Sequence, residues 1–133
     1  MYVGTQVGAR GDSDLEQWAQ LGVVNVCSDP PGSAHDWVLD DLKGHVEKLA
    51  GYGITLDMIQ IPLSSTPLEV SQSPNVMLGK SPERDREIES IQNLIRMCGE
   101  AGIPAVKYNM CIVGDPRTER EEGRGGSSVS AFR

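Results

Sequence analysis

This chain of 133 residues has few aromatic residues and no long apolar run. Only 5% of its residues are Phe, Trp or Tyr, so a buried core must be built mainly from Val, Ile, Leu and Ala. No apolar stretch approaches the ~18 residues that a membrane-spanning helix needs. The N-terminal residues carry neither the basic nor the apolar region of a signal peptide. We therefore expect a cytoplasmic protein with no membrane partner.

Paired cysteines and a positive charge balance are missing as well. Cys27, Cys98 and Cys111 are widely spaced, and no CxxC pair occurs, which disfavours a disulfide framework or a zinc cluster. The chain has 12 Lys and Arg residues against 19 Asp and Glu residues, for a net charge of −7. A nucleic-acid binder needs a basic face for the phosphates, so we expect no nucleic-acid partner.

What the sequence does contain is a repeated junction, in which an amphipathic stretch ends in glycine and a β-rich run follows. The junctions lie at Gly22, Gly53 and Gly102. Glycine just past a helix end can take the left-handed conformation that closes the helix without steric strain. The junctions therefore predict three helices, each of which ends at one of these glycines and leads directly into a strand.

Strands and helices are predicted to alternate along the chain. The predicted strands cover residues 2–6, 23–27, 56–61 and 106–112. The predicted helices begin near residue 12, near residue 40 and at Pro82, where Ser81 is expected to be the N-cap. The third helix carries an expected apolar stripe of Ile88, Ile91, Ile95 and Cys98, with Leu94 beside it. This alternation predicts parallel strands joined by right-handed crossovers.

Barrels and open doubly wound sheets both use this order. The first strand-to-helix loop lacks GxGxxG, which disfavours a dinucleotide-binding Rossmann fold. We predict an α/β fold that is the N-terminal half, about four strand–helix units, of a TIM (β/α)8 barrel. Residues 1–133 would form one partial domain, with a Gly/Ser-rich loop after the fourth strand at about 114–133. Because four units leave two unpaired sheet edges, we expect self-association or a missing C-terminal half.

Candidate binding residues lie in or near the loops that follow strands. His35, after the second predicted strand, is either a ligand contact or a surface histidine. Asn109 is polar inside an apolar run, so it either faces a ligand or makes a structural hydrogen bond. Arg117 and Arg124 either hold a carboxylate or phosphate or belong to a solvated loop. His45 is expected on a solvent-facing side or an edge of the second helix, and no metal ligands or catalytic residues are predicted.

Several segments resemble one enzyme family. Residues 78–89, Leu-Gly-Lys-Ser-Pro-Glu-Arg-Asp-Arg-Glu-Ile-Glu, followed by residues 101–103 and by Tyr108-Asn109, are similar to mannonate dehydratase. That family belongs to the xylose-isomerase-like TIM barrels. The resemblance implies a carbon–oxygen lyase that converts D-mannonate to 2-keto-3-deoxygluconate in hexuronate breakdown. It also implies a divalent metal, usually Mn²⁺, and a small sugar-acid substrate.

The resemblance implies that the metal ligands and catalytic groups come from the later half of the barrel. Asn109, Arg117 and Arg124 remain as possible contacts to a substrate carboxylate or hydroxyl. Met110 replaces an aromatic residue of the family, and Ile59-Gln60 stands where the family has Glu-Ser. A sugar isomerase or epimerase on the same type of barrel therefore stays open, as does a non-catalytic half-barrel that binds a small polyol or acid.

Overall fold

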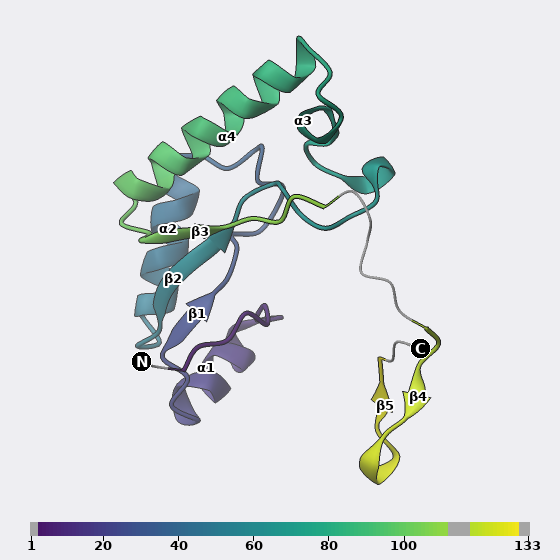
Figure 1. The fold of residues 1–133 in the computed structure, drawn as a ribbon. Coiled ribbons are helices and arrows are strands. Elements are labelled where there is room, and N and C mark those ends of the chain that lie inside the picture. Colours follow the sequence, from purple (N-terminus) through teal and green to yellow (C-terminus); the bar gives the residue numbers. More distant parts are fainter. Residues whose placement is uncertain (1–2, 112–117, 131–133) are drawn as a thin grey trace.

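The structure is a computed structural model that describes residues 3–111 and 118–130 (Figure 1). A parallel sheet in the order β1-β2-β3 lies at its centre. The strands are β1 (Asn25–Cys27), β2 (Thr55–Gln60) and β3 (Ala105–Lys107). Thr5 extends the sheet beside β1 through a parallel bridge to Val26. The predicted parallel α/β fold is therefore confirmed, with the first predicted strand reduced to this bridge among the described residues.

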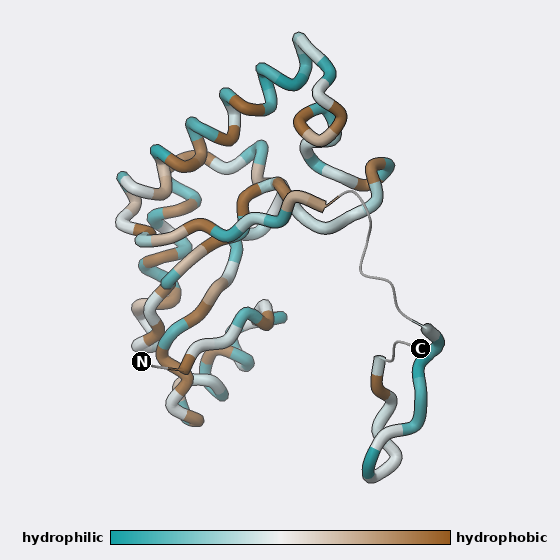
Figure 2. The backbone as a smooth tube through the Cα atoms, in the orientation of Figure 1, coloured by the Kyte–Doolittle hydropathy of each residue, from teal (hydrophilic) through white to brown (hydrophobic). Residues whose placement is uncertain are grey.

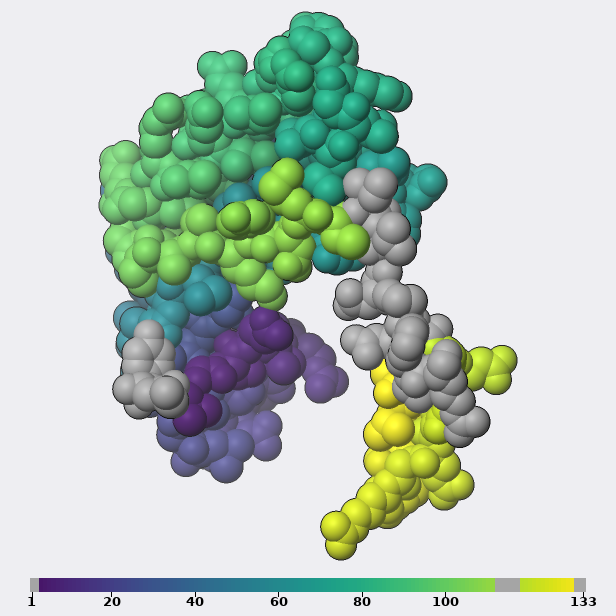
Figure 3. Space-filling model, viewed as in Figure 1, coloured from purple at the N-terminus to yellow at the C-terminus, as the bar shows by residue number. Residues whose placement is uncertain are grey.

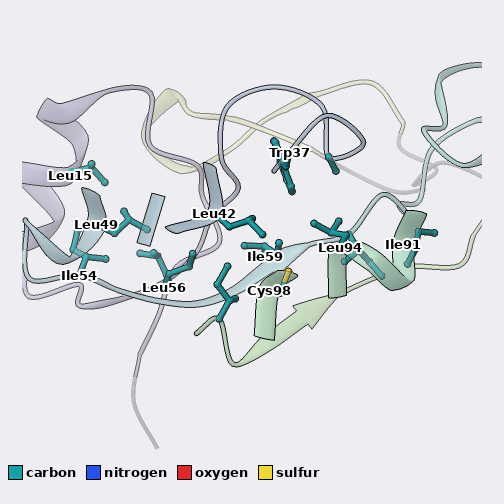
Figure 4. Close-up of a cluster of buried hydrophobic side chains, with 14 residues drawn as sticks. Leu15, Trp37, Leu42, Leu49, Ile54, Leu56, Ile59, Ile91, Leu94 and Cys98 are labelled. Atoms are coloured by element: carbon teal, nitrogen blue, oxygen red, sulfur yellow. The ribbon is translucent and has the colours of Figure 1, made fainter. Parts of the chain in front are cut away.

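Helices follow the strands as the sequence predicts. They are α1 (Asp12–Gln20), α2 (Leu39–Ala50) and α4 (Glu83–Glu100). Helices α2 and α4 contact each other and pack on one face of the sheet (Figure 1). The core forms at this contact, where Leu42 and Leu49 of α2, Ile59 of β2 and Leu94 of α4 are almost completely buried (Figure 4).

The three predicted helix-closing glycines behave alike. Gly22, Gly53 and Gly102 have φ angles of 76°, 72° and 79°. In each case the amide of the next residue donates to the carbonyl five residues earlier, at 2.9 to 3.0 Å. This bond satisfies a carbonyl that the helix end leaves without a partner. The junctions that organise the sequence are therefore three copies of one helix-closing motif.

The start of α4 differs from the prediction. The helix begins at Glu83 with Pro82 as its N-cap residue, so the prediction of Ser81 as N-cap was wrong. The Ser81 hydroxyl donates instead to the Asp85 carboxylate at 2.7 Å. The Ser81 side chain therefore bonds to a side chain one turn into the helix. A capping serine would instead accept a hydrogen bond from a backbone amide.

The buried face of α4 contains Ile91 and Cys98 as predicted, but it differs from the prediction between them. Leu94 is only 2% exposed, whereas Ile95 is 43% exposed, so the prediction of Ile95 in the apolar stripe was wrong. The buried residues Ile91, Leu94 and Cys98 are spaced by three and four positions, which keeps them on one side of a helix. Figure 2 shows hydrophobic residues recurring along α4 between hydrophilic ones.

The long loop between β2 and α4 contains two short helices that the sequence analysis did not predict. They are η1 (Leu68–Val70) and α3 (Pro74–Leu78). The Glu87 carboxylate of α4 accepts from the Asn75 side chain at 2.6 Å and from the Val76 amide at 2.9 Å. Gly79 then ends α3 with a φ of 67°. Residues 74–89 therefore form one structural unit, in which α4 holds α3.

The described part of the tail, residues 118–130, forms a short hairpin where the sequence predicts a loop. Strands β4 (Glu121–Glu122) and β5 (Ser128–Val129) pair antiparallel around the turn η2 (Arg124–Gly126). The Arg120 guanidinium donates to the Ser128 hydroxyl at 2.9 Å. Strand β4 is mostly hydrophilic (Figure 2).

None of the helices in the described ranges combines the length and apolar character needed to cross a membrane.

Candidate functional site

Three loops meet where the parallel strands end. Backbone hydrogen bonds continue past the strands and join the loops. The Ser28 amide donates to the Met58 carbonyl at 3.2 Å, and the Ile61 amide donates to the Lys107 carbonyl at 3.0 Å. The backbone amide of Asn109 donates to the Leu63 carbonyl at 2.7 Å. The carboxyl ends of parallel strands lie at one edge of the sheet, which is where α/β folds place their ligands. This edge is therefore the candidate site.

A cavity of about 240 Å³ lies between the loops after β1 and β2. Asp29 and Gln60 line it, and the Asp29 carboxylate accepts from the backbone amide of Gln60 at 2.8 Å. Trp37 closes part of the wall, and its indole N–H donates to the Pro31 carbonyl at 3.1 Å. The carboxylate gives this cavity a group that can bind hydroxyls.

His35 joins the two loops that border this cavity. Its Nε2 lies 2.7 Å from the Gln72 carbonyl, so this nitrogen must carry a proton. Its Nδ1 lies 3.3 Å from the Ser90 hydroxyl of α4, and the fully buried Ser73 hydroxyl lies 3.5 Å from Nε2. His35 thus makes structural hydrogen bonds, and its predicted contact with a ligand stays a prediction.

A second contact crosses the face of the sheet that lies opposite α2 and α4. The Lys107 ammonium donates to the Gln6 side-chain carbonyl at 2.8 Å. Gln6 follows Thr5 at one edge of the sheet and Lys107 ends β3 at the other, with β1 and β2 between them. In a flat sheet three strand spacings amount to about 14 Å. The direct contact therefore indicates a sheet that curves toward this face, as in a barrel. Figure 3 shows the purple N-terminal segment reaching the green segment that contains β3.

This concave face holds a hollow of about 380 Å³. Its polar lining residues include Gln6, Asn25, Cys27 and Asp57. Burial, and then the negative charge of Asp29, raise the pKa of the Cys27 thiol, whereas the positive charge of Lys107 lowers it. Cys27 therefore lies within the fields of both charged residues. Sequence analysis missed Lys107, although a lysine inside an apolar run is a signal that could have found it.

His45 has a half-buried position at the edge of α2, which agrees with the predicted edge. Its Nε2 lies 3.2 Å from the Ser28 hydroxyl, a contact that the sequence analysis did not predict. Burial lowers the pKa of His45, and a hydrogen bond to the Ser28 backbone opposes this effect. His45 also lines a cavity of about 210 Å³ with Arg10 and Lys48. The imidazole therefore connects α2 to the loop after β1.

The other predicted binding residues are spread over the chain. Asn109 is exposed just past β3, and its backbone amide donates to the Leu63 carbonyl. Arg124 lies in the turn of the hairpin, and its carbonyl accepts from the Ser127 hydroxyl at 3.0 Å. Arg117 lies outside the described residues. Of the predicted binding residues that the structure describes, Asn109 and His35 thus lie near the candidate site, and all the predicted binding roles stay predictions.

The described residues do not fit the metal that the sequence resemblance implies. Across residues 3–111 and 118–130, no group of three or more His, Cys, Asp or Glu side chains could hold a metal ion. Protein sites for divalent cations normally combine several such ligands. No chemical step through a metal is therefore derived from these residues.

The parallel strands, the alternating helices and the curved sheet together define this chain as a section of a parallel α/β barrel. The structure of mannonate dehydratase from Streptococcus suis serotype 2 matches it with a TM-score of 0.75 and 23% sequence identity. The match covers 99% of this chain and 38% of that one. At this identity the likeness establishes the fold, and the predicted resemblance to mannonate dehydratase is confirmed at that level.

Comparisons of the sequence itself add no further relative: no protein-family model and no curated protein matches it.

Proposed function

We propose that this chain is part of a carbon–oxygen lyase that dehydrates D-mannonate to 2-keto-3-deoxygluconate. The observation that carries the proposal is the fold match to a mannonate dehydratase over 99% of the chain. The segments that resemble that family in sequence also support it. They run from the end of α3 into α4, through the turn after α4, and to the two residues that follow β3.

The reaction removes water from two neighbouring carbons of the sugar acid. A proton leaves C2 and the hydroxyl leaves C3, and the enol that remains becomes the 2-keto group. Such a reaction needs contacts that orient the carboxylate and hydroxyls, and the polar groups at the carboxyl ends of β1, β2 and β3 are suited to this task. The proposal takes the metal, usually Mn²⁺ in this family, and its ligands to lie beyond the residues described here.

The test is to measure formation of 2-keto-3-deoxygluconate with Mn²⁺, first by this chain alone. The measurement is then repeated after mixing with the part of the Streptococcus suis enzyme that lies beyond the 38% matched by this chain. We expect activity only in the mixture. A matched control is Val26→Asp, which buries a charge at a position that is 1% exposed. Activity that survives this change would come from a contaminating enzyme.

Other outcomes would point to a different function. Turnover of an aldose or ketose by the mixture, without turnover of mannonate, would favour a sugar isomerase or epimerase. Binding of a polyol or acid without turnover would favour a non-catalytic half-barrel. Folded material that neither binds nor converts D-mannonate would contradict the proposal.

A further inference from the structure

Among the described residues, Lys107 has no acidic partner. In the described part of the chain the ion pairs involve Arg10, Lys48 and Arg84, and none involves Lys107. Its ammonium is held by a neutral amide, that of Gln6. The chain carries a net charge of −7, so the absence of an acidic partner at this position, within these residues, does not reflect a shortage of carboxylates.

The polar side chains around Lys107 suit the binding of an anion. The residue is half-buried at the carboxyl end of β3. Gln60 of β2 is its register partner, and side chains of register partners in neighbouring strands lie on the same face of a sheet. Gln6 fixes the ammonium from the other side at 2.8 Å. One positive charge and two amide groups thus converge at the end of the sheet where ligands bind.

This combination suits a hydroxy acid. A carboxylate at Lys107 would gain a charge-assisted hydrogen bond, which is about twice as strong as a neutral one. The amides of Gln6 and Gln60 can each donate to an oxygen and accept from a hydroxyl. Gln6 also lines the hollow of about 380 Å³, so a small polyhydroxy compound held at Lys107 can extend into this hollow past Gln6.

We infer that Lys107, positioned by Gln6 and flanked by Gln60, binds the carboxylate of a sugar-acid ligand. This inference rests on the proposed function for the class of ligand. It replaces the arginines of the tail, which the sequence analysis selected, with a cation on the sheet itself.

The test compares D-mannonate with D-mannitol, which has a CH₂OH group in place of the carboxylate, by calorimetric titration of the whole chain. We expect D-mannonate to bind the unmodified chain more tightly. Lys107→Met keeps the length of the side chain and removes its charge, so it should weaken D-mannonate binding by about tenfold or more. Binding of D-mannitol should not change. Lys107→Arg should retain most of the affinity for D-mannonate.

The matched control is Lys43→Met, which removes the same charge from an exposed position on α2. It should leave both affinities unchanged. Circular dichroism of each variant shows whether it folds, and Lys107→Arg supplies the test if Lys107→Met does not fold.

Cys27 offers a second readout at the site. Because Lys107 lowers the pKa of the Cys27 thiol, Lys107→Met should slow alkylation of Cys27 at neutral pH. Bound D-mannonate should slow the alkylation too, since its negative charge would offset the positive charge of Lys107. Peptide mass spectrometry separates this reaction from alkylation of the exposed Cys111. A purely structural lysine would give no protection by D-mannonate.

The outcomes separate this inference from the proposed function. Unchanged D-mannonate affinity in Lys107→Met would overturn the inference and leave the lyase proposal standing. Lys107-dependent binding of D-gluconate, without binding of D-mannonate, would support the site and contradict the proposed substrate. A folded chain that binds neither acid would overturn the inference.

Discussion

Two histidines near the candidate site occupy different environments. The ring nitrogens of His35 contact three polar groups, on the loop after β2 and on α4. His45 is half-buried, and its ring contacts Ser28 at the end of β1. Sequence alone ranked His35 as the candidate ligand because it lies in a strand-end loop. The structure gives both histidines the same role, which is to hold the loops that follow β1 and β2.

At the scale of a single residue, His45 predicts a pH dependence of stability. Its pKa is lowered from 6.5 in the folded chain, chiefly by burial. Below about pH 6.5 the unfolded chain therefore binds a proton that the folded chain resists. The contribution of neutral His45 is fully present above the unfolded pKa, and it is lost as the pH falls through the lower, folded pKa.

Urea unfolding at about pH 7.5 and about pH 5.5 checks this prediction. The unmodified chain should lose more free energy of unfolding between the two values than His45→Gln, which retains a hydrogen-bonding group but does not titrate. Equal losses in the two proteins would show that another group carries the pH dependence.

At the scale of elements, the helix ends follow from local chemistry. Gly53 closes α2 with a φ of 72°, and the Ile54 amide donates to the Leu49 carbonyl at 3.0 Å. Gly44, inside the same helix, has an ordinary φ. An added Cβ would meet no heavy atom within 4 Å at either glycine. The two positions therefore differ in backbone conformation and not in available space.

This difference predicts opposite effects of one substitution. Gly53→Ala should lower the free energy of unfolding by about 1 kcal/mol, because alanine is strained in the left-handed region. Gly44→Ala should raise it by about 0.5 kcal/mol, because alanine is the better residue inside a helix. Urea denaturation of both variants gives the comparison. Destabilisation by Gly44→Ala would mean that this part of α2 makes contacts that the structure does not contain.

The segment that carries the family resemblance also acts at this scale. Gly79 closes α3, and Glu87 of α4 holds the Asn75 side chain and the Val76 amide. These residues thus have structural roles in the unit of α3 and α4. The resemblance at residues 78–89 is therefore evidence about the fold, and the chemistry has to be argued from the ends of the strands.

At the scale of the whole molecule, the sheet of the described residues has an edge at Thr5 and another at β3. Both edges carry backbone groups that can pair with another strand. In a closed barrel such edges join each other through further strands.

We expect isolated chains to associate through these edges. Sedimentation velocity over a dilution series should show a dimer or larger species that dissociates as the concentration falls. The urea midpoint should rise with protein concentration, because association stabilises only the folded state. A well-folded monomer at all concentrations would contradict this prediction and would show that the edges are protected.

The sequence alone determined the order of elements and the helix ends. Glycine at 22, 53 and 102 acts through its own backbone conformation, and alternation of apolar runs and amphipathic stretches acts over a few residues. Both signals are local, so they can be read without knowing what each element packs against. The parallel α/β fold follows from them, whereas the likeness to mannonate dehydratase was inferred from the resemblance of residues 78–89, 101–103 and 108–109 to that family.

Only the tertiary structure decided which side chains meet. Leu94 rather than Ile95 is buried because the position of α4 against α2 and the sheet selects one side of the helix. The bond between Gln6 and Lys107 joins residues 101 positions apart, and it depends on how the strands are arranged in the sheet. Local patterns carry no information about such contacts between distant residues, which is why the sequence analysis did not select Lys107.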